Sequence, residues 1–144
     1  MKLVVDSNVL FTYFWKDSVV ESILAKKNVT LFTPEYALEE IRKYAQEIQE
    51  KTRLDRQAFE MKLKGLKESV HFIQLETYKQ VLVSTIKSIQ NQSAEIAEEL
   101  FKDIDFLALA IYFNHPLWSN DQLLKQQTKV IILNTKEVIT LLEK

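Results

Sequence analysis

Acidic side chains occur in four separate segments of this sequence, each beside a short apolar run. In an open parallel sheet, residues that follow the strands gather at one edge, where ligands bind. Carboxylates gathered there repel each other unless protons or cations neutralise them. Mg²⁺ and Mn²⁺ prefer such all-oxygen sites, and paired ions can hold both reacting oxygens of a phosphodiester. The acids are Asp6, Glu39, Glu40, Asp103, Asp105 and Asp121.

Five apolar runs are predicted to be the strands that position these acids. Strands alternate with helical patterns, which predicts an α/β fold with helices on both faces of a parallel sheet. Residues 36–69 contain no strand signal and are expected to form a protruding helical hairpin. We expect a single domain over residues 1–144. The predicted strands are 3–5, 29–32, 70–75, 116–118 and 130–133.

Local signals mark where some helices begin. Thr33 and Pro34 resemble an N-cap followed by a first helical residue. Asn134 and Glu137 have the spacing of a capping box for the last helix. Residues 106–113 are apolar on all sides, so that helix is expected to be buried.

Composition excludes several classes of site. The 144 residues include no cysteine, so disulfides, thiolate zinc sites and cysteine nucleophiles are absent. The single glycine argues against glycine-rich phosphate loops. No stretch approaches the roughly 18 apolar residues of a membrane span, so we expect a soluble, cytoplasmic protein without a membrane partner. His71 and His115 are expected to be packed or surface residues rather than catalysts.

The near-neutral net charge does not by itself exclude binding to nucleic acid. The chain carries −1 overall, but residues 93–121 hold six acids and one lysine. The rest of the chain is therefore mildly basic. The near-neutral total is consistent with an acidic metal site in a protein that binds nucleic acid.

Four motifs together resemble those of the PIN-domain ribonucleases. The resemblance covers nearly the whole chain in the family's order. It implies a three-layer α/β/α fold with a central five-stranded parallel sheet, and RNA hydrolysis by a water activated by Mg²⁺ or Mn²⁺. Many small members are VapC-like toxins held inactive by an antitoxin protein. The motifs are Leu3–Leu10, Thr33–Pro34 with Leu38–Ile41, Asp103–Ala110, and Leu117–Asp121.

The resemblance assigns roles residue by residue. It implies that Asp6, Glu40, Asp103 and Asp121 are catalytic and bind metal. Asn8 takes the place of a small polar residue that shapes the site, and Ser119 belongs to the fourth motif. An antitoxin and a second copy of the chain are the protein partners expected beside the RNA substrate.

Two adjacent acids could supply the second motif. Glu39 belongs to a charged stripe with i, i+4 spacing, typical of a solvated helix face. Glu40 lies between Tyr36 and Tyr44, so its stripe is expected to be partly buried. The family pattern also favours the acid before the branched residue Ile41. We therefore choose Glu40.

The third motif keeps two candidates. Counting back five positions from Ala108, as the family pattern suggests, gives Asp103. Family members often have proline at the position of Asp105. Either aspartate could also cap the following helix. We rank Asp103 first and keep Asp105 as a further metal ligand.

Substrate contacts are less specific in the sequence. A basic stripe on the second hairpin helix, interrupted by Glu60, could contact phosphates, although a solvated face is an equal interpretation. An aromatic group after Asp6 could form part of the core, a partner surface or a stacking platform for unpaired bases. The basic residues are Arg53, Arg56, Lys64 and Lys67, and the aromatic ones Phe11, Tyr13, Phe14 and Trp15.

Two other functions compete with the ribonuclease as interpretations of this sequence. A PIN-like fold that no longer cuts would serve as an RNA-binding or protein-assembly module, but all four acidic motifs remain. A phosphohydrolase of the haloacid-dehalogenase kind requires a second aspartate two residues after the first. Asn8 occupies that position.

Overall fold

Five parallel strands form one sheet at the centre of the molecule, in the order β3-β2-β1-β4-β5. The structure is a computed structural model and describes residues 1–26, 28–127 and 129–144. All five predicted strands are present with shifted ends. The third is shortened because a helix begins at Leu75. The strands are β1 (Lys2–Val5), β2 (Thr30–Pro34), β3 (His71–Ile73), β4 (Leu117–Trp118) and β5 (Ile132–Leu133).

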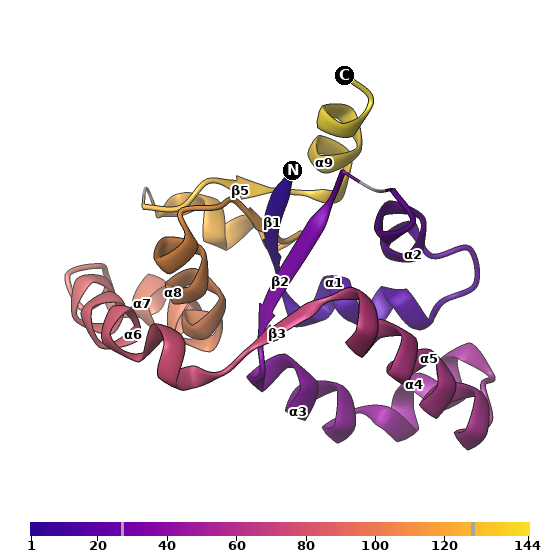
Figure 1. The fold of residues 1–144 in the computed structure, drawn as a ribbon. Coiled ribbons are helices and arrows are strands. Elements are labelled where there is room, and N and C mark those ends of the chain that lie inside the picture. The colour runs from indigo at the N-terminus through magenta and orange to yellow at the C-terminus, as the bar shows by residue number, and fades with distance from the viewer. Residues whose placement is uncertain (27, 128) are drawn as a thin grey trace.

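Helices cover both faces of this sheet, which confirms the predicted three-layer α/β/α arrangement. In Figure 1, helices α6, α7 and α8 lie on one side of the strands and α2 to α5 on the other. The helices are α1 (Ser7–Phe11), α2 (Val19–Leu24), α3 (Tyr36–Lys43), α4 (Ala45–Thr52), α5 (Arg56–Ser69), α6 (Leu75–Ile89), α7 (Ala94–Lys102), α8 (Ile104–Phe113) and α9 (Thr135–Leu142), with 3-10 turns η1 (Thr12–Phe14) and η2 (Gln122–Gln126).

Helix α8 is buried through Ala110, as its composition predicts, but Tyr112 near its C-terminal end is exposed. It packs against β1, β2 and β4 on one side and against α6 on the other. Residues 106–110 are all buried, so an apolar residue is favoured at every position of these turns. Asp103 precedes the helix as its N-cap residue, which places the third acidic motif at the N-terminus of α8.

The segment 36–69 forms three helices rather than a two-helix hairpin. Helices α3 and α4 are separated at Tyr44, which leaves the helical region of backbone space. Helix α4 ends at Arg53, whose φ of 60° is left-handed. Phe59 of α5 stacks on Phe14 of η1 with ring centroids 4.9 Å apart, so this projecting unit is packed onto the segment that follows β1.

Two predicted helix starts have different outcomes. The capping box of α9 is confirmed, because Asn134 and Glu137 each accept a hydrogen bond from the other's backbone N–H. Thr33 and Pro34 are not helical, because they extend β2. The Thr33 hydroxyl instead donates to the Val5 carbonyl oxygen over 2.8 Å. None of the described helices is long and apolar enough to cross a membrane.

Candidate acidic active site

The first and fourth acidic motifs meet because β1 and β4 are neighbours in the sheet. Val5 pairs with Trp118, so Asp6 and Ser119 leave adjacent strands at the same edge. The Asp6 backbone N–H donates to the Trp118 carbonyl oxygen over 3.1 Å and continues this pairing. The Asp6 carboxylate is buried and accepts a 2.9 Å hydrogen bond from the Val9 N–H, which caps α1.

The buried Ser119 side chain connects the two acids that flank it. Its hydroxyl hydrogen-bonds the Asp6 carboxylate, and its oxygen accepts a hydrogen bond from the Asp121 N–H over 3.1 Å. Asp121 in turn accepts from the Leu123 N–H over 3.0 Å and caps η2. Ser119 therefore holds the loop after β4 in register with the end of β1.

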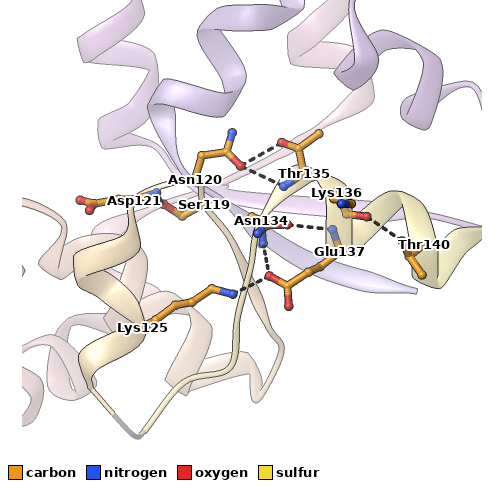
Figure 2. A network of polar contacts seen from close by, with 9 residues as sticks. All are labelled: Ser119, Asn120, Asp121, Lys125, Asn134, Thr135, Lys136, Glu137 and Thr140. Atoms are coloured by element: carbon orange, nitrogen blue, oxygen red, sulfur yellow. Dashed lines mark hydrogen bonds and ion pairs between the residues drawn. The ribbon is translucent and has the colours of Figure 1, made fainter.

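A second polar network fixes the far side of this loop, as Figure 2 shows. Asn120 Oδ1 accepts hydrogen bonds from the backbone N–H and the hydroxyl of Thr135. Trp118 Nε1 donates to the same hydroxyl over 3.0 Å. The Asp121 carboxylate points away from this network. The sequence did not predict this contact between Asn120 of the fourth motif and Thr135, because nothing local indicates that the β4 loop and α9 meet.

Glu40, rather than Glu39, faces the acids of the strand ends. Glu40 is half-buried on α3, and its carboxylate hydrogen-bonds the Ser7 side chain. Burial raises the pKa of Glu40, and the nearby Asp6 carboxylate raises it further. Glu39 is exposed, in agreement with the solvated stripe that its spacing indicates.

Asp103 lies within electrostatic reach of the other three acidic motifs. Burial contributes most to raising its pKa to about 7, and the carboxylates of Asp6, Asp121 and Glu40 add to the effect. Burial likewise raises the pKa of Asp6, to which Asp121 contributes. The four segments therefore bring their acids into one electrostatically coupled group, which we call the acidic cluster: Asp6, Glu40, Asp103 and Asp121.

Asp105, the other candidate of the third motif, is engaged by a tyrosine. The Tyr78 hydroxyl donates to Asp105 Oδ2 over 2.6 Å. Burial raises the pKa of Tyr78, and this hydrogen bond to a carboxylate raises it further. Asp105 also raises the pKa of Glu40, so it borders the acidic cluster. Tyr78 was not identified from the sequence, because it lies 27 residues away.

The remaining predicted residues lie around the cluster or apart from it. Asn8 is exposed and lines a cavity beside Glu40. Arg56, Lys64 and Lys67 are exposed on α5. Arg53 does not share that helix, since it ends α4. Glu60 is paired with Arg42, and Arg56 and Lys67 also lower its pKa. The positive charge of the predicted basic stripe is therefore partly neutralised by Glu60 on the same helix.

The donor chemistry of the cluster fits a hard divalent cation. Within residues 1–26, 28–127 and 129–144, none of its four carboxylates forms an ion pair with a lysine, arginine or histidine. Carboxylates that share a site and lack cationic partners are stabilised by a bound cation. As placed in the described chain, however, no three acidic or histidine side chains are arranged to hold one ion together.

Comparison with known proteins identifies this architecture. The family model described as PIN domain matches residues 4–140. The solved structure of VapBC2 from Rickettsia felis, bound to a DNA fragment from its promoter, has a similar fold, with a TM-score of 0.68. The alignment covers 93% of this chain and 98% of that one at 16% sequence identity. No curated protein sequence matches the chain. With its family match and its fold in agreement, the chain belongs to the PIN domain family.

Proposed function

We propose that this protein is a metal-dependent endoribonuclease that hydrolyses RNA phosphodiester bonds, with Mg²⁺ or Mn²⁺ as its cofactor. PIN domains are generally nucleases, and the family match covers nearly the whole chain. The observation that carries the proposal is the coupling within the acidic cluster. It is most evident in Asp103, whose pKa is raised to about 7.

Asp6, Glu40, Asp103 and Asp121 are the proposed ligands, with Asp105 as a further ligand. A bound divalent cation would lower the pKa of water and offset charge on the phosphate. The chain's own contribution is positioning. Ser119 and Ser7 hydrogen-bond the carboxylates of Asp6 and Glu40 and hold them at the sheet edge. The mildly basic remainder, including Arg53, Arg56, Lys64 and Lys67, would attract the RNA backbone.

The biological role we propose is that of the toxin in a toxin–antitoxin pair acting in the cytoplasm. The fold matches a chain of the Rickettsia felis VapBC2 structure along almost its whole length. A protein partner that covers the acidic cluster would then control cleavage. The similarity at 16% identity supports a shared fold.

A second candidate function is an inactive PIN-like module that binds RNA or assembles with protein. One observation favours it, namely that no three described acidic or histidine side chains are arranged to hold a single ion. Mn²⁺ affinity separates the two candidates. Calorimetric titration should give saturable Mn²⁺ binding for a nuclease, whereas an inactive module would bind no Mn²⁺ and leave RNA intact.

The decisive experiment is Mn²⁺-dependent cleavage of single-stranded RNA by wild type and by Asp6→Asn. Asparagine caps a helix as well as aspartate does, so the α1 cap should survive and the fold should be retained. We expect cleavage to be lost in this variant while circular dichroism is unchanged. The matched control is Asp17→Asn, an exposed position with φ 58° that asparagine tolerates. Equal cleavage by Asp6→Asn and wild type would refute the proposed site.

A further inference from the structure

A cavity of about 320 Å³ opens directly beside the acidic cluster and shares Glu40 with it. Its walls come from α1 and the residue after η1 on one side, and from α3 and α4 on the other. This volume lies at the lower end of small-ligand pockets, and suits a single planar group rather than the face of a helix. Its lining residues are Asn8, Phe11, Trp15, Glu40, Tyr44, Glu47, Ile48 and Lys51.

Two aromatic side chains in this lining are accessible to solvent. Trp15 is 39% exposed and Tyr44 is 38% exposed. Phe11 packs against Tyr44 edge to face, with centroids 5.8 Å apart, and so supports the Tyr44 ring from within the protein. The cavity thus offers supported aromatic surfaces that can stack with a planar ligand.

Polar and cationic groups at the rim complete the site. Lys43 Nζ lies 5.4 Å from the Tyr44 ring centroid, and Lys51 forms a 2.9 Å ion pair with Glu47. Asn8 supplies an amide that both donates and accepts hydrogen bonds. Glu40 and Glu47 also line the cavity, and Glu47 pairs with Lys51, so Lys43 beside the Tyr44 ring is the ammonium group that suits the phosphate of a nucleotide whose base stacks in the cavity.

We propose that this cavity binds one unpaired base of the RNA, next to the phosphate that lies at the acidic cluster. This inference rests on the proposed ribonuclease function and adds to it a contact with the base of the nucleotide whose phosphate lies at the acidic cluster. An unpaired base can turn out and stack on an aromatic side chain, whereas a paired base is held in the duplex. Because every base has a stacking face, Trp15 and Tyr44 would select unpaired structure rather than sequence.

The chain contains its own reporter for this interaction. Of its two tryptophans, Trp15 lines the cavity and Trp118 is fully buried at 0% exposure outside it, so direct contact with a ligand in the cavity is made by Trp15. A single-stranded RNA octamer mixed with the protein and Mn²⁺ in a stopped-flow instrument should quench Trp15 emission before cleavage begins. The same octamer in a duplex should leave the emission unchanged. Removing the base at one position should abolish quenching and raise the Kd about 5- to 100-fold.

Matched substitutions test the cavity independently. Tyr44→Leu keeps apolar contact with Phe11 but removes the stacking face, so we expect a 5- to 100-fold higher KM for RNA with little change in kcat. Tyr44→Phe keeps the ring and should behave as wild type. Tyr112→Leu is the control, because Tyr112 is 45% exposed on α8 and does not line this cavity.

The outcomes separate this inference from the nuclease proposal. Quenching without cleavage would support the base site and refute the nuclease, whereas cleavage without quenching would refute the base site alone. Equal KM values for Tyr44→Leu and Tyr44→Phe would also overturn it. Trp15 emission that changes with protein concentration alone would assign the cavity to a second copy. Normal cleavage by Tyr44→Leu, with loss of inhibition by a co-expressed protein partner, would assign it to that partner.

Discussion

The Tyr78 hydroxyl donates a hydrogen bond to Asp105 Oδ2 over 2.6 Å and ties the first turn of α8 to helix α6. Tyr78 is buried, so this bond satisfies a polar atom that would otherwise be shielded from water. Asp103, two residues earlier, faces the carboxylates of the acidic cluster. The third acidic motif thus supplies two aspartates with different contacts. Asp105 accepts the hydrogen bond from Tyr78, and Asp103 belongs to the acidic cluster.

The first prediction concerns this bond. Tyr78→Phe keeps the ring but removes the donor, so the free energy of unfolding should fall by about 1–2 kcal/mol. Urea unfolding followed by circular dichroism measures the change. Asp105→Asn is the matched variant, because its amide oxygen still accepts the bond and should cost less stability. A larger loss for Asp105→Asn than for Tyr78→Phe would contradict this account.

The second prediction is that removing one charge stabilises the metal-free protein. Asp103→Asn relieves burial of a carboxylate among other carboxylates, and the Asp103 side chain makes no capping hydrogen bond that would be lost. After allowance for solvent screening, we expect a gain of about 1 kcal/mol and a Tm a few degrees higher. Thermal unfolding in the presence of a chelator tests this. A lower Tm for Asp103→Asn would argue against a clustered site.

Stability should also depend on pH in a defined direction. The pKa of Asp103 is about 7 in the folded protein and near 3.8 ordinarily, so between these values the folded state binds more protons than the unfolded state. The free energy of unfolding therefore falls as pH rises from about 4 to 7, with a slope no steeper than about −1 kcal/mol per unit from this group. Burial also raises the pKa values of Asp6 and Glu40, so these two groups likewise lower the free energy of unfolding as pH rises.

Denaturant titrations at several pH values measure this slope without metal. The Asp103→Asn variant should show a shallower dependence over the same range. Addition of Mn²⁺ should restore stability at neutral pH, because the ion stabilises the ionised carboxylates. A metal-free protein whose stability rises from pH 4 to 7 in parallel with its Asp103→Asn variant would contradict the prediction.

The fourth prediction separates the two adjacent glutamates of α3. Glu40→Gln should weaken Mn²⁺ binding and slow RNA cleavage by about 10- to 100-fold or more, since Glu40 borders Asp6 and is held by Ser7. Glu39→Gln should leave both unchanged because Glu39 faces solvent. Calorimetry with Mn²⁺ and initial cleavage rates give the comparison. The reverse ranking would move the second ligand to Glu39.

Much of the architecture could be read from local patterns. Short apolar runs marked all five strands, although β4 and β5 contain only two residues each. The apolar character of residues 106–113 predicted that α8 is largely buried. The spacing of Asn134 and Glu137 predicted the capping box at the start of α9. These features depend on the hydrophobicity and hydrogen bonding of near neighbours, which the order of residues records directly.

Other features depended on packing that local patterns do not contain. The break between α3 and α4 at Tyr44 interrupts a sequence stripe with helical spacing, which is formed by Leu38, Ile41, Ala45 and Ile48. Thr33 had the signature of a helix cap, but pairing of β2 with β1 and β3 kept it in the sheet, where its hydroxyl donates to Val5. Tertiary contacts thus overrode weak local preferences.

The sequence by itself determined the order of the four acidic motifs and the kind of element that carries each one. It also narrowed the metal-binding acid of the second motif to Glu39 or Glu40, and that of the third motif to Asp103 or Asp105. Only the tertiary structure decided that β1 and β4 are adjacent, which sets Asp6 beside Ser119 and Asp121. The physical reason is that strand pairing and shared burial bring together residues more than 100 positions apart. Carboxylates that are far apart in the sequence therefore raise one another's pKa values.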